Sequence, residues 1–452
     1  MTDADLIESL RRENAELRRQ LAEALKTIEE WKRGHRERSK RRSSRAEGSR
    51  RGTGRGPGRP MGAKGSNRPV PERIDDTVEH PLPARCPHCD GEVEDGGETQ
   101  STVVQDIPEV RVRNVRHVGG VGKCKRCQKR VAARLPGMSA LGDAATQVQL
   151  GPGLIALGLS LHVDEHVTVH GVSRIFATWF DVRVTPSGLC QLFARQAARA
   201  APAVVEIERH VRTSGVVGMD ETTIRQNGDL AWAWLARTDK ASLFRIELSR
   251  GAWVAEEMLG KDFKGIVCSD FYGAYTRMGE WEHGYCNAHT IREAKKIAEV
   301  TGDADAVRFC ERLRSIFAEG QKAQVSGDAD EREHVRRRMD YLIGSTRFSH
   351  LPDVTRLQRR LDEHRVGVLL FVDRPDVPMT NNASERDIRP FAMQRKVTGG
   401  TRSSRGSFTL ATNMSVTQTL RKNGLPLRAW IHGAFEAHVA GQPPPSVFAA
   451  PN

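Results

Sequence analysis

The sequence predicts a multidomain α+β protein, and three observations support this prediction. The chain has 452 residues, which is too long for one ordinary domain. The spacing of its apolar residues changes along the chain, from a seven-residue repeat, through helical stretches, to short strand-like runs. Two C-x-x-C pairs between these regions indicate a small metal-binding module. We therefore expect a coiled coil, a linker, a zinc-ribbon-like module, a helical segment and an α/β domain with a helical insertion.

Residues 1–31 are expected to form a coiled coil. Their apolar residues alternate at spacings of three and four, which is typical of a two-helix seam. Asn14 at an a position would fix the register and favour a dimer. The seam consists of Ile7, Leu10, Asn14, Leu17, Leu21, Ala24 and Ile28. A single amphipathic helix packed on its own chain is the alternative. Self-association is favoured because a basic linker follows and offers no local partner.

Residues 32–79 are expected to form a disordered basic linker. The chain has a net charge of +13, and residues 32–60 hold twelve Lys or Arg against two Glu. Such a local surplus indicates a tether for a polyanion, although a solvated linker without a partner has the same composition. The candidate DNA-binding residues in it are Arg41, Arg42, Arg50 and Arg51.

The expected location of the protein is the cytoplasm, associated with the nucleoid. We find no apolar run long enough to cross a bilayer. The first residues, MTDADLIESLRREN, lack the basic start and apolar block of a secretory signal.

Residues 80–135 predict a zinc-binding module. Cys86 and Cys89 form one C-x-x-C pair and Cys124 and Cys127 the other, and the strand-like runs STVVQDI and EVRVRNVRHV lie between them. Two such knuckles can bring four thiolates to one tetrahedral Zn²⁺. A redox dithiol, or a site that has lost its metal, is the alternative. His88 lies inside the first knuckle and is expected to be a bystander.

Residues 145–205 are expected to form three helices. GPGLIALGLSLHVDEH is the first, VHGVSRIFATWF the second and TPSGLCQLFARQAARA the third, with Thr185 as N-cap and Pro186 at the first helical position. Helix, short turn, helix is the layout of DNA-reading modules. From the pattern alone, an ordinary helical hairpin fits equally well.

Residues 213–286 and 366–440 predict an α/β catalytic domain, and residues 287–365 a helical insertion. GVVGMDETTI, LAWAWLART and SLFRIELSR are expected to be strands, followed by a helix at Ala252–Leu259 and the strand GIVCSD. VGVLLFVDRP is expected to close the sheet. NNASERDIRPFAMQRK is expected to be a helix opened by its asparagines.

Three acidic residues are candidates for catalysis and for binding a metal. Asp220 and Asp270 each end an apolar strand, and Glu385 lies on the following helix with Arg389 one turn later. Such a set of carboxylates could hold Mg²⁺ (or Mn²⁺) ions for phosphodiester chemistry, although ordinary surface acids would show the same pattern. Glu221 faces the opposite side of its strand and is a poor catalytic candidate.

The order of motifs resembles the transposases of the insertion-sequence-66 (IS66) family. The resemblance runs from the coil to near residue 440, through the blocks MDET, SDFYGAY, CNAHTIREAKK and TNNASERDIRPFAMQRK. It implies an RNase H-like fold and a catalytic triad of Asp220, Asp270 and Glu385. It also implies an enzyme that cuts DNA at element ends and joins the ends to a target.

The implied partners are DNA, a second copy of the chain in a homodimer or higher oligomer, and accessory transposition proteins. The DNA-binding residues expected beside the triad are Arg386, Arg389, Arg395 and Lys396. Two other functions stay open: a catalytically inactive DNA-binding regulator, and a structure-specific nuclease that hydrolyses without joining.

Two segments depart from the family pattern. Where many relatives continue RKNWLF, this chain has RKVTGGTRSSRGS, so contacts with DNA at this loop can differ. YCNAH replaces a form that usually contains tryptophan. Cys286 and His289 in that block suggest either a second metal or, as we favour, packing of the insertion's base against the catalytic domain.

Overall fold

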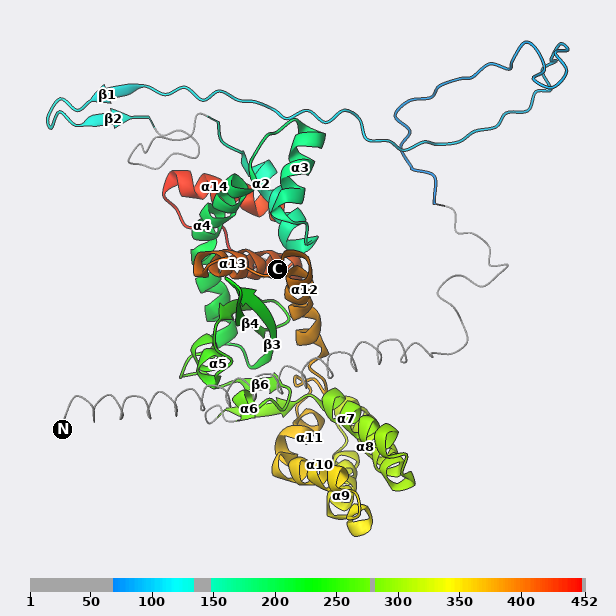
Figure 1. Ribbon diagram of the computed structural model, residues 1–452, viewed down its shortest axis with the longest axis vertical. Helices are drawn as coiled ribbons and strands as arrows, with labels where there is room; N and C mark the ends of the chain where they lie inside the picture. Colours follow the sequence, from blue (N-terminus) through cyan, green and yellow to red (C-terminus); the bar gives the residue numbers. More distant parts are fainter. Residues whose placement is uncertain (1–67, 134–147, 277–280, 449–452) are drawn as a thin grey trace, which may run out of the picture. The chain divides into compact units, whose positions relative to one another are not determined.

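The computed structural model describes residues 68–133, 148–276 and 281–448. The chain divides into two compact units, Met1–Asp106 and Ile107–Asn452, which are treated separately below (Figure 1). The predicted coil and the linker arginines lie outside the described residues.

The described part of the first unit is extended except for one turn. Cys86 N donates to Gly91 O at 2.8 Å, and an isolated bridge joins Arg85 to Glu92. The run beginning at residue 101 forms no strand within the described residues, so this prediction is wrong.

The second unit begins with the other knuckle. The short strands β1 (Val121–Lys123) and β2 (Arg130–Ala132) pair antiparallel around the second C-x-x-C pair. The strand predicted from EVRVRNVRHV is not formed, and Val110, Val115 and Val118 are exposed. Alternation of apolar residues stabilises a strand only where a second layer covers its apolar face, and these valines have no such cover.

The helical segment agrees with its prediction and shares a core with the sheet. Helix α2 (Pro152–Leu159) continues into a π-helical turn at Ser160–Asp164, α3 spans Val169–Phe180, and α4 spans Pro186–Arg212. Thr185 caps α4 by accepting the N–H of Gly188 at 3.1 Å. One continuous apolar core extends from this segment into the sheet. Helix α4 is therefore part of the body of the domain as well as the second helix of the predicted DNA-reading pair.

A mixed five-stranded sheet of order β5-β4-β3-β6-β7 forms the centre of the second unit. Strands β3 (Val216–Gln226), β4 (Asp229–Arg237) and β5 (Ser242–Glu247) are antiparallel neighbours, whereas β6 (Ile266–Ser269) and β7 (Glu282–Tyr285) continue parallel to β3. The three predicted strands, GIVCSD and helix α5 (Ala252–Leu259) are all present. The short helix α6 (Gly273–Thr276) follows β6.

The segment predicted to close the sheet is a helix, so this prediction is wrong. Helix α11 (Arg365–Asp373) packs on β7 and on the insertion, and β7 is the edge strand. Its backbone lies so close to β7 that a Cβ at Gly367 would be 2.5 Å from His283 O. In a short run that is buried on several sides nearly every residue is apolar. Its hydrophobic periodicity therefore cannot distinguish a strand from a helix.

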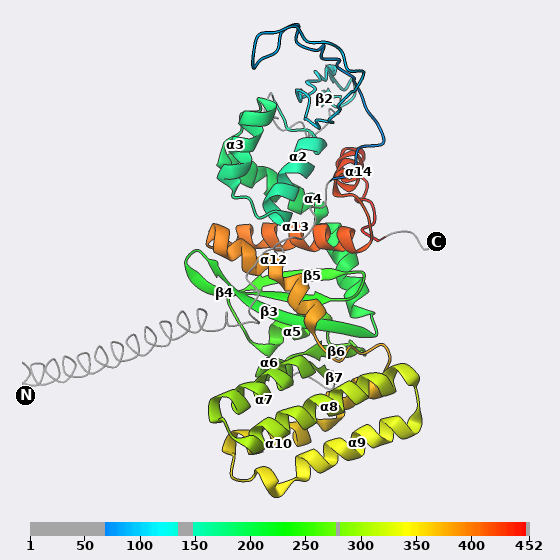
Figure 2. The ribbon, with the colours of Figure 1, turned by 90° about the vertical axis from the view of Figure 1, so that its right-hand side faces the viewer.

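Helix α13 (Ser404–Lys422) covers the other edge of the sheet, and α14 (Leu427–Ala440) follows it (Figure 2). Ser242 N donates to Thr419 Oγ1 at 3.1 Å and Phe244 N to Ser415 Oγ at 2.9 Å. These hydroxyls satisfy edge groups of β5 that would otherwise be free to pair with another strand.

The insertion is a helical bundle with its own apolar core. It comprises α7 (Asn287–Thr301), α8 (Ala304–Ser326), α9 (Ala329–Gly344) and α10 (Pro352–Glu363), with a short 3₁₀ turn at Thr346–Phe348. Its core also takes in residues of β6, β7 and α11, so the bundle is anchored on the parallel side of the sheet. Within the described ranges, no helix is long and apolar enough to cross a membrane.

Candidate active site

Two acidic residues face each other where β6 ends beside β3: Asp270 directly follows β6, whereas Asp220 lies within β3, which continues to Gln226. The prediction that Asp220 ends its strand is therefore wrong. The register pairs Val216 with Ile266 and Gly218 with Cys268. Continued by two residues, it sets Asp220 beside Asp270 on neighbouring strands, which lie about 4.8 Å apart. Both side chains are half-buried. Glu221 N donates to one carboxylate and Tyr272 N to the other, each at 2.9 Å.

Helix α12 (Asn382–Thr398) carries Glu385 in its first turn and lies across β3 and β4 (Figure 2). A Cβ at Gly218 would lie 2.4 Å from Ser384 Oγ, so the helix approaches β3 within the space that only glycine leaves. Side chains alternate along a strand, and Asp220 therefore lies on the same face of β3 as Gly218, the face that α12 covers.

The start of α12 is held by Asn381 in a way that the sequence did not indicate. We expected asparagine to cap the helix, but its side chain makes no capping bond. Its Nδ2 instead donates to Met219 O at 2.7 Å, and its backbone N–H donates to Cys286 Sγ at 3.1 Å. Cys286 N donates in turn to Ser269 O at 2.8 Å. The helix is thus fastened to β3 and to β6 directly beside the two aspartates.

Cys286 and Asn287 connect the insertion to the sheet. Asn287 N donates to Met379 O at 3.1 Å, and its Nδ2 donates to Val368 O at 2.9 Å. Burial raises the pKa of the Cys286 thiol. These contacts match the packing role that we favoured for this block over a second metal site.

Helix α7 brings two further residues to Glu385: His289, for which we favoured a packing role, and Arg292, which the sequence analysis missed. Arg292 Nη2 lies 2.7 Å and His289 Nε2 lies 3.6 Å from Glu385 Oε1. Their spacing of three residues is a detectable signal, because it places both on one face of the helix that follows β7.

Asp220 has an altered acidity because of where it lies. Burial raises its pKa to about 7, and the negative charges of Glu221, Asp270 and Glu385 act in the same direction, against the Glu221 N–H that lowers it. The three predicted carboxylates therefore interact electrostatically. Their potential ligand atoms do not all lie within 4.8 Å of one another, but neighbouring carboxylates that repel one another favour a divalent cation.

Glu221 lies on the other side of β3, as expected. Its carboxylate is buried, accepts from Arg250 at 2.5 and 3.0 Å, and accepts from Tyr275 Oη at 2.5 Å. Arg250 also stacks 3.6 Å from the ring centre of Tyr272, the residue whose N–H holds Asp270. Glu221 thus supports the loop that carries Asp270.

The predicted basic residues of α12 do not all face the same way. Arg395 points inward and donates to Thr222 Oγ1 at 3.2 Å and to Thr223 O at 2.7 Å. Arg386, Arg389 and Lys396 are exposed. Asp387 faces Arg237 and Lys422, and burial lowers the pKa of Lys422 to about 8.

Each C-x-x-C pair forms the same local turn. Asp90 N donates to Cys86 O, and Gln128 N donates to Cys124 O, both at 2.9 Å. Asp90 and Gln128 each have a φ of 57°. Backbone N–H groups, first that of His88, lower the pKa of Cys86, and those of Cys127 and Arg126 lower the pKa of Cys124. Such turns prepare thiolates for a metal.

A different acidic group has the closest spacing. Among the described residues, Asp303, Asp305 and His350 are the three potential ligands whose atoms all lie within 4.8 Å of one another. Asp305 is paired with Arg347 at 2.8 Å, and Asp303 caps α8. Ion pairing and capping account for this group without a metal.

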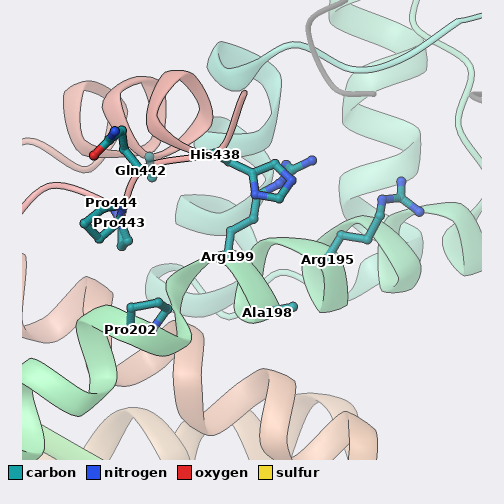
Figure 3. A pocket seen from close by; sticks show the side chains of 9 residues that line it. Arg195, Ala198, Arg199, Pro202, His438, Gln442, Pro443 and Pro444 are labelled. Atoms are coloured by element: carbon teal, nitrogen blue, oxygen red, sulfur yellow. The ribbon is translucent and has the colours of Figure 1, made fainter. Parts of the chain in front are cut away.

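A cavity of about 350 Å³ lies between α4 and α14 (Figure 3). Arg195, Arg199 and His438 line it together with prolines, and no carboxylate does. Burial, followed by the charge of Arg195, lowers the pKa of Arg199. The cavity is thus a cationic feature of the predicted DNA-reading segment.

The sequence profile described as "Transposase IS66 family" matches residues 147–408. Three curated relatives come from Sinorhizobium fredii (strain NBRC 101917 / NGR234). "Uncharacterized protein y4jO" is 30% identical over 184 residues, which is 40% of this chain and 56% of that protein. "Uncharacterized protein y4jD" is 22% identical over 81% of this chain and 77% of its own length. For "Uncharacterized protein y4hP" the identity is 24%, over 83% and 75%.

Gly218→Ala is expected to destabilise the protein by about 1–3 kcal/mol, because the added methyl group overpacks the contact between β3 and α12. Gly215→Ala is the matched control, since a Cβ there meets nothing within 4 Å. Urea unfolding of both variants measures the difference. Equal stability of the two would show that the close approach at Gly218 is not required.

Proposed function

The chain belongs to the IS66 family of transposases, and from this premise we propose that it binds the ends of its mobile element, cuts DNA there and joins the 3′-hydroxyl ends to target DNA. The observation that carries the proposal is the position of Asp220, Asp270 and Glu385. The proposal is supported by the pairing of β3 with β6, by the close docking of α12 on β3, and by the influence of the charges of Asp270 and Glu385 on Asp220. The mixed sheet with helices packed against it supports the implied RNase H-like fold.

The residues at this edge fit Mg²⁺ or Mn²⁺. They are hard oxygen donors, and the mutual repulsion that helps to raise the pKa of Asp220 would be relieved by a divalent cation. Bound there, such ions supply an activated nucleophile and stabilise the leaving oxygen. Asp220, Asp270 and Glu385 would be the ligands.

The surrounding residues set the positions of these ligands. Tyr272 N–H orients Asp270, and Arg292 and His289 hold Glu385. Asn381 keeps the first turn of α12 against β3. In the proposed reaction Arg292, which is half exposed, also provides a positive charge beside the phosphate.

An inactive regulator is the less favoured alternative, because a regulator has no need to keep three carboxylates together against their repulsion. A nuclease that hydrolyses without joining uses the same ligands. Only the fate of the 3′-hydroxyl separates it from a transposase.

DNA is expected to contact several parts of the chain. The α3–α4 pair, with Arg195 and Arg199 beside it, is the proposed end-binding segment. The basic linker is the proposed tether. Pairing of two ends through the N-terminal coil rests on residues outside the described part, as does any role of accessory proteins.

Asp220→Asn, Asp270→Asn and Glu385→Gln are each expected to lower DNA cutting by at least about a thousandfold while leaving DNA binding intact. Cutting and joining are measured on a duplex that carries an element end, with Mg²⁺. Glu311→Gln, an exposed change on α8, is the control. Wild-type cutting by any of the three variants would remove that residue from the proposed site. Cutting without joining would favour the nuclease.

Metal binding is expected to strengthen as the pH rises toward about 7, the pKa of Asp220, because the proton must leave before an ion binds. In the metal-free protein the sign is opposite. Ionising this acid lowers stability progressively between its ordinary pKa of 3.8 and about 7.

Asp220→Asn should therefore stabilise the metal-free protein at pH 8 by at most ~2 kcal/mol relative to pH 5, after allowance for partial solvent screening. The same variant should lose the stabilisation that Mg²⁺ provides. Thermal unfolding with and without Mg²⁺ measures both effects, and Asp362→Asn, an exposed change on α10, is the control. A pH-independent response of the wild type to Mg²⁺ would contradict this assignment.

We also propose that Cys86, Cys89, Cys124 and Cys127 bind one Zn²⁺ at Zn–S distances of about 2.3 Å. The full chain should contain one zinc per molecule by elemental analysis. Cys86→Ser and Cys124→Ser should each lose it, whereas Cys190→Ser, an exposed cysteine outside the pairs, should keep it. If the two variants each lost only part of the zinc, the pairs would not share one ion.

A further inference from the structure

A pattern of basic residues continues from the candidate site into the loop whose sequence departs from the family, beyond the residues already expected to bind DNA. Residues 388–435, between Asp387 and Glu436, contain no Asp or Glu. Five basic side chains along α12, the following loop and the start of α13 are exposed: Arg386, Arg389, Lys396, Arg402 and Arg405. None of the five makes an ion pair with any residue in the described part of the chain.

The helical members of this set lie on one stripe. Arg386, Arg389 and Lys396 follow at spacings of three and seven, so they share one face of α12. Met393 and Val397 on the same stripe are 40% and 46% exposed. From residue 386 to 396 the helix rises about 15 Å, which equals the rise of about four base pairs of DNA.

The loop at Gly399–Thr401, whose sequence departs from the family, is held in place by backbone hydrogen bonds. Gly399 and Gly400 have φ values of 71° and 106°, and a Cβ at Gly400 would lie 2.2 Å from Arg225 O. Thr401 N donates to Arg225 O, and Asn227 N donates to Thr401 O, both at 2.8 Å. The loop therefore docks on the β3–β4 hairpin, and only glycine fits at the closest point.

The docking of this loop on the hairpin fixes the start of α13 and so the positions of Arg402 and Arg405. Ser403 caps α13 by accepting Gly406 N at 3.1 Å, so Arg402 precedes the cap and Arg405 lies in the first turn. Phe408, one turn further along α13, is 54% exposed. Cations interleaved with exposed apolar side chains complement the phosphates and sugars of a nucleic-acid backbone.

We propose that these five residues form a basic track for the backbone of duplex DNA that leads away from Glu385, and that the Gly399–Gly400 loop extends it by two phosphate contacts through Arg402 and Arg405. The inference rests on the proposed function, since it concerns the DNA at that site. Arg386, Arg389 and Lys396 were already expected to bind DNA; the inference adds Arg402 and Arg405 and joins the five into one continuous track. Because the contacts are to phosphates, the track binds without regard to sequence.

The test measures binding without divalent metal ions, so it does not depend on catalysis. The affinity of the full chain for two duplexes of different sequence is followed by fluorescence anisotropy over a range of salt concentrations. Arg402→Gln/Arg405→Gln should reduce the salt slope of log K by about 2 for both duplexes, because each phosphate contact contributes about 1. Affinity should fall by about tenfold or more.

Arg308→Gln/Arg356→Gln is the matched control, because it removes the same charge from exposed arginines of the insertion that already have acidic partners. An equal change in both double variants, or no change in the first, would overturn the track. Loss of cutting in the triad variants with an unchanged slope in the Arg402→Gln/Arg405→Gln protein would retain the proposed function and reject only this inference.

A second variant tests the loop without altering charge. Gly400→Ala should lower the slope because its methyl group meets Arg225 O. Gly399→Ala shares the strain of a positive φ but its Cβ meets nothing within 4 Å, so it should lower the slope less. Thermal unfolding confirms that both are folded. A folded Gly400→Ala protein with the wild-type slope would contradict the positioning role of the loop.

Discussion

The close contact of α12 with β3 is the constraint on which the candidate site depends. A helix normally packs on a sheet at a distance set by side chains on both, but here the absence of a side chain at Gly218 lets Ser384 approach the strand. The Asn381 amide then bonds to the strand itself. Glu385 therefore reaches the edge where Asp220 and Asp270 lie, although 115 residues of sequence separate it from Asp270.

The carboxylates of the candidate site repel one another, and the packing of the sheet and α12 holds them in place against this repulsion. Burial raises the pKa of Asp220, and the negative charges of Glu221, Asp270 and Glu385 raise it further. Arg292 partly neutralises Glu385, while Glu221 is neutralised separately by Arg250 on the other face of β3. The nearby cationic side chains therefore pair with Glu385 and Glu221. The hydrogen bonds to Asp220 and Asp270 come from backbone N–H groups. Such an unequal distribution of charge favours a divalent cation at the aspartates.

Different elements pack against the two edges of the sheet. On the antiparallel side, hydroxyls of α13 satisfy the edge strand, and the same helix packs against α4. On the parallel side, His289 and Arg292 of the insertion reach Glu385, and Cys286, directly before the insertion, accepts the N–H of Asn381. The insertion is therefore a support for the third carboxylate as well as a spacer between the motifs. The helical segment before the sheet shares its core, so a DNA-reading helix there would be rigidly connected to the candidate site.

The sequence by itself determined the elements whose signals are local. The apolar runs predicted the strand that contains Asp220 and the strand that Asp270 follows. Thr185 and Pro186 predicted the start of α4, and the TNNASER block placed Glu385 on a helix. The sequence did not predict α11 as a helix, because an apolar run buried on several sides has no visible hydrophobic period. It also predicted a strand at the valines before β1, where no second layer covers the apolar side chains. Nor could it show that Asn381 bonds to a strand, that Arg395 faces inward or that Arg292 meets Glu385. Those three contacts join residues 93–173 positions apart. Only the folded chain decides them, because the parallel register of β3 and β6 and the glycine-sized gap at α12 are properties of how the layers pack.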